Sequence, residues 1–159
     1  MTCVQLALSM DCPHPERSSP GRSALCTLRS SSPRERTLPT ILIVDDHAAV
    51  RTAVRDLFEG SMASVVCGEA ENGVDAIAKA QELKPDLIVL DLSMPVMNGF
   101  EAAKIFRDLF PTIPIFMLTA HSMVETEHAA LQIGIRAVFS KHQDLSPLIT
   151  QARAVFDPH

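Results

Sequence analysis

The 159-residue sequence contains no Trp, no Tyr, no Cys-x-x-Cys pair and no Gly-x-Gly element. Without paired cysteines, neither a redox dithiol nor a disulfide framework is expected, and a reducing compartment is favoured. Without a glycine-rich loop, a nucleotide-binding domain is disfavoured. No apolar run approaches the ~18–20 residues that span a bilayer, and the start of the chain lacks the basic region and cleavage site of a secretory signal. We therefore expect a cytoplasmic protein with no membrane contact.

Positive charge is scarce beyond residue 40. Residues 1–40 contain five Arg, three acids, seven Ser and five Pro, whereas residues 41–159 contain nine Lys and Arg against 16 acids, a net charge of −7. An acidic body argues against direct binding of nucleic acid, which requires clustered basic side chains. Residues 1–39 are predicted to be a disordered Ser/Pro/Arg-rich tail, because they bury too little apolar surface to offset the entropy of ordering. Residues 40–157 are predicted to form one domain.

From residue 41 onwards, short apolar runs alternate with amphipathic stripes. The runs predict strands at residues 41–44, 65–67, 86–91, 114–119 and 136–140. The stripes predict helices at about residues 50–58, 76–83, 98–109, 124–133 and 145–156. Strands that are apolar on both faces indicate a parallel sheet covered by helices on both sides. We expect an α/β fold with a doubly wound five-stranded parallel sheet, flavodoxin-like (βα)5, in strand order 2-1-3-4-5.

Polar residues follow four of the five predicted strands. They are Asp45 and Asp46, Asp91, Thr119, and Lys141. The carboxyl ends of parallel strands meet at one edge of the sheet, where such folds bind their ligands. Three carboxylates repel one another unless a hard cation such as Mg²⁺ neutralises them. One carboxylate could then attack phosphorus, while an ammonium and a hydroxyl bind the phosphoryl oxygens.

Each of these residues also has an ordinary structural explanation. Asp at a strand end often caps a helix, Thr is a common strand residue, and a lone Lys is usually solvated. Their joint occurrence in this order favours a site. A zinc site is a further alternative, because three histidines lie near the same edge: His47, His121 and His142. Carboxylates would favour Mg²⁺ there.

Four segments resemble a response-regulator receiver domain of two-component signal transduction. They are residues 41–46, 86–99, 114–120 and 138–141. The likeness covers residues 40–157 and describes a stand-alone receiver, and residues 45–47 resemble the subgroup that usually precedes helix-turn-helix output domains. We expect either that the domain acts through another protein or that the chain is a fragment.

The resemblance implies roles for individual residues. Asp91 would be the phosphoacceptor that becomes 4-aspartylphosphate, and Lys141 would bind its phosphoryl group. Thr119 and Phe139 would form the switch pair, the ring moving inward as the hydroxyl moves toward the phosphate. Mg²⁺ would be held by four groups: the side chains of Asp45, Asp46 and Asp91 and the backbone carbonyl of Ser93. From its position two residues after Thr119, we also expect His121 to tune how water reaches the acyl phosphate.

The resemblance implies a phosphorelay switch and not an enzyme beyond self-catalysed phosphotransfer and autodephosphorylation. Its partners would be a sensor histidine kinase or histidine phosphotransfer protein and a downstream effector, with a homodimer on phosphorylation. The downstream segment 122–139 is expected to express the switch, although its apolar members are expected in the core: Val124, Leu131, Ile133 and Ile135.

Two other functions compete with this interpretation. One is a phosphorylation-independent interaction module of the same fold. The other is a haloacid-dehalogenase-like phosphatase, which also uses an Asp nucleophile with Mg²⁺. That enzyme requires a second acid two residues after the nucleophile, where this chain has Ser93.

Overall fold

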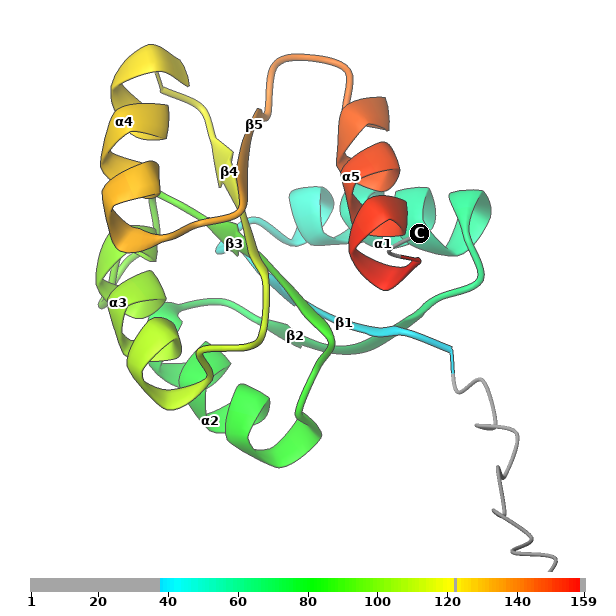
Figure 1. Cartoon of the computed structure of the whole chain (residues 1–159), viewed down its shortest axis with the longest axis horizontal. Coiled ribbons are helices and arrows are strands. Elements are labelled where there is room, and N and C mark those ends of the chain that lie inside the picture. The colour runs from blue at the N-terminus through cyan, green and yellow to red at the C-terminus, as the bar shows by residue number, and fades with distance from the viewer. Residues whose placement is uncertain (1–37, 122, 158–159) are drawn as a thin grey trace, which may run out of the picture. The chain divides into compact units, whose positions relative to one another are not determined.

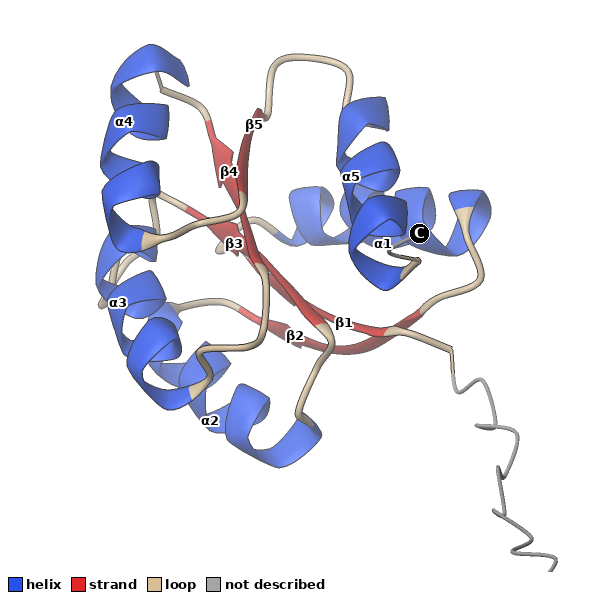
Figure 2. Cartoon of the chain, in the orientation of Figure 1, coloured by secondary structure: helices blue, strands red, loops and turns tan. Residues whose placement is uncertain are grey.

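A computed structural model describes residues 38–121 and 123–157. Apart from residues 38 and 39, the predicted tail lies outside the described residues. The ten elements alternate strictly, as Figure 2 shows: β1 (Thr40–Val44), α1 (Ala48–Ser61), β2 (Val65–Ala70), α2 (Gly73–Leu83), β3 (Leu87–Asp91), α3 (Gly99–Leu109), β4 (Ile115–Thr119), α4 (Met123–Ile133), β5 (Ala137–Ser140) and α5 (Ser146–Phe156).

The five strands form one parallel sheet in the order β2-β1-β3-β4-β5. The predicted fold class and strand order are therefore confirmed. Helices α1 and α5 cover one face of the sheet, and α2, α3 and α4 cover the other (Figure 1). Strands β1, β3 and β4 are almost fully buried, because they have a neighbouring strand on both sides and helices on both faces.

Alternate residues of each central strand face opposite cores. Leu42, Ile88 and Leu90 pack beneath α2 and α3 with Phe106. On the other face, residues such as Ile43 and Val89 pack against α1 and α5. This alternation follows from the two-residue period of a strand and rigidly fixes the direction in which each strand end points.

The second strand is longer than its apolar run predicts. It continues through Gly68 and Glu69 to Ala70, whereas the prediction ended it at Cys67. The sheet order places β2 at an edge, paired only with β1, so its polar residues can face solvent or ionic partners. Cys67 is half-buried, and its thiol donates a hydrogen bond to the Ile41 carbonyl oxygen at 3.4 Å.

Two apolar residues of α4 contradict the prediction that they lie in the core. Val124 is 78% exposed and Leu131 72% exposed, whereas Ile135 is buried and Ile133 partly buried against the core. The residues of α4 that are buried are Thr126 and Ala130, so the large apolar side chains of this helix do not mark its buried face. Within the described residues, no helix is long and apolar enough to cross a membrane.

Candidate phosphoacceptor site

Three strand ends bring the predicted acidic and basic residues together. Asp45 follows β1, Asp91 ends β3, and Lys141 follows β5. The Lys141 Nζ lies 2.6 Å from Asp45 Oδ2 and 3.0 Å from Asp91 Oδ1. Both carboxyl groups are fully buried, and the ammonium that joins them is largely buried.

The parallel register explains why these residues meet. Val44 pairs with Leu90, and Asp91 pairs with Leu118, so the three central strands end at the same level of the sheet. Lys141 is held at the same level because its backbone N–H donates to the Thr119 carbonyl oxygen at 2.8 Å. The charged residues that follow the apolar strands therefore lie together at the carboxyl-end edge of the sheet.

The site shifts the pKa of two of its members. Burial raises the pKa of Asp91, and the neighbouring Asp45 charge adds to that rise, while Lys141 and a backbone bond from Ser93 oppose it. Burial lowers the pKa of Lys141, but its bonds to Asp45 and Asp91 outweigh this and raise it overall. The ammonium therefore stays charged, and the pocket holds more carboxylate than one ammonium neutralises.

The second oxygen of Asp91 has no hydrogen-bond partner among the described residues. Asp91 Oδ2 is buried, so an unpartnered acceptor there would cost about 1–3 kcal/mol. Asp46 adds another carboxylate, less buried, at the rim. Carboxylate oxygens without enough donors are the ligands that Mg²⁺ prefers, so the residues present fit that ion.

The three histidines do not converge on one point. His47 Nδ1 lies 2.6 Å from Asp46 Oδ1, and a ligand atom of each of Asp45, Asp46 and His47 falls within one 4.8 Å cluster. His121 contacts Ser93 instead, and the His142 backbone N–H donates to Ser140 Oγ at 3.2 Å. A zinc site built from all three histidines is therefore not formed by the described residues.

Thr119 and His121 lie on the other side of the pocket. Thr119 is fully buried, and its Oγ1 accepts a hydrogen bond from the His121 backbone N–H at 2.9 Å. The His121 imidazole Nε2 lies 2.9 Å from Ser93 Oγ. His121 thus links the loop after β4, next to Thr119, to the loop after β3, next to Asp91.

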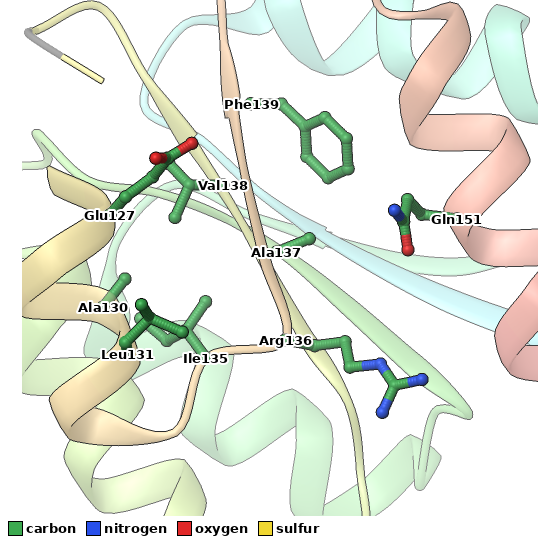
Figure 3. A pocket seen from close by; sticks show the side chains of 9 residues that line it. All are labelled: Glu127, Ala130, Leu131, Ile135, Arg136, Ala137, Val138, Phe139 and Gln151. Atoms are coloured by element: carbon green, nitrogen blue, oxygen red, sulfur yellow. The ribbon is translucent and has the colours of Figure 1, made fainter. Parts of the chain in front are cut away.

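Phe139 lies on β5 with its ring in the core. The ring meets Phe116 edge-on, with centroids 5.5 Å apart. Figure 3 shows the ring projecting from β5 to the side that faces α5. Phe139, Val138 and Leu131 border a pocket of about 300 Å³ beside α4, β5 and α5. The ring that we expected to move inward is therefore inward already in this structure.

Two residues that support the site were missed by sequence reasoning. Gly99 begins α3 where a Cβ atom would overlap the Asp91 carbonyl oxygen and lie 2.8 Å from Leu92 Cα. Arg51 is buried on α1 and donates to the Asp45 carbonyl oxygen. The signal for Arg51 was available: it shares the i, i+3, i+7 stripe with Val54 and Phe58, so a charge was bound to be buried there.

Comparison with known proteins agrees with this geometry. The profile of the response regulator receiver domain family matches residues 41–153. The chain is 35% identical over 117 residues to the response regulator protein VraR of Staphylococcus saprophyticus, covering 74% of this chain and 56% of that protein. It is 39% identical over 109 residues to the uncharacterized transcriptional regulatory protein YhcZ of Bacillus subtilis, covering 69% and 51%. The chain thus spans about half the length of these curated relatives.

Solved structures share the fold as well. A two-component response regulator of the LuxR family from Aurantimonas sp. SI85-9A1 superposes with a TM-score of 0.70 at 28% identity, covering 75% of this chain and 85% of that one. The chemotaxis protein CheY4 of Vibrio cholerae superposes with a TM-score of 0.67 at 30% identity, covering 75% and 99%.

The fold and the pocket define an α/β signalling domain with an acidic edge that suits a divalent cation. The chain belongs to the response regulator receiver domain family of two-component systems. Phosphorylation on an Asp and binding of Mg²⁺ at the acidic pocket are general in this family, and its members interact with histidine kinases and effector domains.

Proposed function

We propose that Asp91 is the residue of this chain that accepts the phosphoryl group. The observation that carries the proposal is the pairing of Asp91 Oδ1 with Lys141, while Oδ2 is buried and has no hydrogen-bond partner in the described part of the chain. Lys141 orients the carboxylate through Oδ1, and lone pairs of the carboxylate remain available for attack on phosphorus. A new O–P bond forms at Asp91, the bond from phosphorus to the donor breaks, and the leaving group keeps that electron pair.

Asp45, Asp46 and Asp91, with the backbone carbonyl of Ser93, are the groups that would hold Mg²⁺. The ion supplies positive charge for the phosphoryl oxygens when bound. Lys141 remains protonated beside both buried carboxylates and would bind a phosphoryl oxygen. The Thr119 hydroxyl is the other donor, once it turns away from the His121 N–H.

Phosphorylation would change what this chain binds through Thr119 and Phe139. The phosphoryl donor would be a sensor histidine kinase or a histidine phosphotransfer protein in the cytoplasm. The phosphorylated chain would then bind a downstream effector or a second copy of itself. The surface of α4 supports this, because Val124 and Leu131 are exposed there and Leu131 lines the same pocket as Phe139. No catalytic role beyond phosphotransfer and autodephosphorylation is proposed.

Intact-mass measurement after incubation with acetyl phosphate and Mg²⁺ tests this function. The wild type should gain one phosphoryl group, and Asp91→Asn should gain none. An unmodified wild type would favour the phosphorylation-independent module instead. Steady turnover of phosphomonoesters would favour the haloacid-dehalogenase-like phosphatase, against which Ser93 argues by supplying no second acid.

His121 is proposed to tune the lifetime of the acyl phosphate. Its contacts with Ser93 and Thr119 span the two loops beside Asp91, so they restrict the approach of water. His121→Ala should shorten the lifetime of the phosphoryl adduct between pH 6 and 8. The matched control His142→Ala, in the loop after β5, should leave the lifetime unchanged. Equal lifetimes in wild type and His121→Ala would contradict this role.

A further inference from the structure

Arg51 is a buried arginine that the proposed chemistry does not use. It is 8% exposed and lies on α1. Its Nη1 donates to the Asp45 carbonyl oxygen at 2.7 Å, its Nε to Glu69 Oε2 at 3.1 Å, and its Nη2 to Glu71 Oε1 at 3.1 Å. The three bonds come from three separate nitrogens of the planar guanidinium, whereas a lysine has a single nitrogen. Arg51 thereby ties the end of β1 to the end of β2.

The backbone of Asp45 is held on both sides as a result. Its N–H donates to the Ala70 carbonyl oxygen at 3.0 Å, and its own carbonyl accepts from Arg51. Asp45 Oδ1 also accepts the His47 backbone N–H at 2.9 Å, which closes the turn that contains Asp46. Removing the Arg51 bond frees one side of the peptide from which both acidic side chains project.

The charge of Arg51 is compensated within its own cluster. Glu69 and Glu71 pair with it, and Arg55, one turn further along α1, pairs with the other oxygen of Glu69. The cluster therefore adds little net field at the acidic pocket. The cluster therefore affects the pocket by fixing the position of the Asp45 backbone and not by its charge.

We propose that Arg51 is a positioning residue for the metal-binding edge, holding the Asp45–Asp46 turn in the geometry that receives Mg²⁺. The inference rests on the proposed function, because it assigns a support to the same carboxylates. Groups that orient metal ligands from behind commonly contribute about 10- to 100-fold in metal affinity. If the turn is already ordered, the free energy of Mg²⁺ binding does not have to offset the conformational entropy lost on ordering it.

Titration of the full-length chain with MgCl₂, followed by backbone amide NMR, tests this role. The dissociation constant for Mg²⁺ should rise about tenfold in both Arg51→Lys and Arg51→Met. The lysine keeps the charge but not the three-way fork, so it should not rescue binding. Arg55→Met is the matched control: it loses a bond to the same Glu69 on the same helix but none to Asp45, and its dissociation constant should stay within about twofold of wild type.

Two results would overturn the role of Arg51. Wild-type affinity in Arg51→Lys would show that charge is sufficient, and equal losses in Arg51→Met and Arg55→Met would show that the cluster acts only through Glu69. A second readout, hydrogen exchange, needs no metal. Hydrogen exchange at the Asp45 and His47 amides should speed up in both Arg51 variants and not in Arg55→Met, and unchanged exchange would contradict positioning.

Failure of the proposed function has a different signature. A wild type that binds no Mg²⁺, or whose Mg²⁺ affinity is unaffected by Asp46→Asn, would reject the metal site itself. The exchange rates of the Asp45 and His47 amides would still decide whether Arg51 holds the turn.

Discussion

At the scale of single residues, Asp91 lies in surroundings that oppose the charge of its carboxylate. Burial is the main reason that its folded-state pKa lies above the ordinary value of 3.8. A carboxyl group whose pKa is raised on folding binds more protons in the native state than in the unfolded state, so stability falls as pH rises through the interval between the two values. The destabilisation is complete once the pH lies above the folded-state pKa.

Asp91→Asn should therefore stabilise the metal-free protein. In urea unfolding with EDTA, followed by circular dichroism, we expect the variant to gain about 1–2 kcal/mol at pH 7 and less at pH 4. Asp144→Asn is the control, because folding lowers the pKa of that exposed carboxyl and its neutral variant should show no gain. A wild type as stable as Asp91→Asn at pH 7 would contradict the cost assigned to the buried charge.

Val96 is a second residue under strain. It lies in the loop after β3 with φ of 70°, a conformation that β-branched residues rarely adopt, and it is 83% exposed. Val96→Asn should increase the free energy of unfolding by about 1 kcal/mol, because Asn tolerates this region and little apolar contact is lost. Val124→Asn, at a comparably exposed position on α4, should give no such gain. Equal effects of the two changes would show that the backbone strain is not relieved.

At the scale of elements, two helical glycines differ in what surrounds them. The glycine at the start of α3 is required by close contacts, whereas the one near the end of α1 is not. Gly99 leaves no room for a Cβ atom against the backbone of Asp91 and Leu92, whereas Gly60 has nothing within 4 Å. Gly99→Ala should cost about 1–3 kcal/mol and weaken Mg²⁺ binding, since the loop after Asp91 must move. Gly60→Ala should stabilise the protein by about 0.5–1 kcal/mol. Thermal unfolding and Mg²⁺ titration check both, and a Gly99→Ala protein as stable as wild type would be inconsistent with the close contact.

Most helices and strands could be predicted from the sequence. Apolar runs gave the three central strands and their polar ends, because burial on both faces excludes other residues until the strand emerges. The extension of β2 through Glu69 could not be predicted from its own residues, since it consists of pairing with residues 42–44 of β1, an element distant in the sequence. The exposure of Leu131 could not be predicted either, because an apolar residue type does not by itself show whether its side chain lies on the buried or the exposed face of a helix.

The site was predictable in membership but not in geometry. The sequence identifies Asp45, Asp91 and Lys141 as neighbours through the order of strand ends. It does not show that one ammonium bridges both buried carboxylates or that Asp91 keeps one oxygen unpartnered, since those facts depend on side-chain rotamers. The link from His121 to Ser93 likewise joins two loops that are 28 residues apart in the chain.

At the scale of the whole molecule, the exposed apolar residues of α4 predict self-association that depends on the state of Asp91. Gel filtration with beryllofluoride and Mg²⁺, a mimic of the phosphoryl group, should give a larger species than the untreated protein. Leu131→Ser should abolish that shift, because it removes the exposed apolar contact beside the pocket lined by Phe139. Leu109→Ser, which changes an exposed leucine on α3, should retain it. An unchanged elution volume would count against a homodimer and favour a separate effector protein.

The central claim is that Asp91, and not another carboxylate of the pocket, accepts the phosphoryl group. Reduction of the phosphorylated wild type with borohydride converts an acyl phosphate to an alcohol, and peptide mass mapping then locates the modified residue. We expect a single modified position, Asp91, whose modification requires Mg²⁺ and is lost in Lys141→Met. Modification at Asp45 or Asp46, or at a residue outside this edge of the sheet, would contradict it.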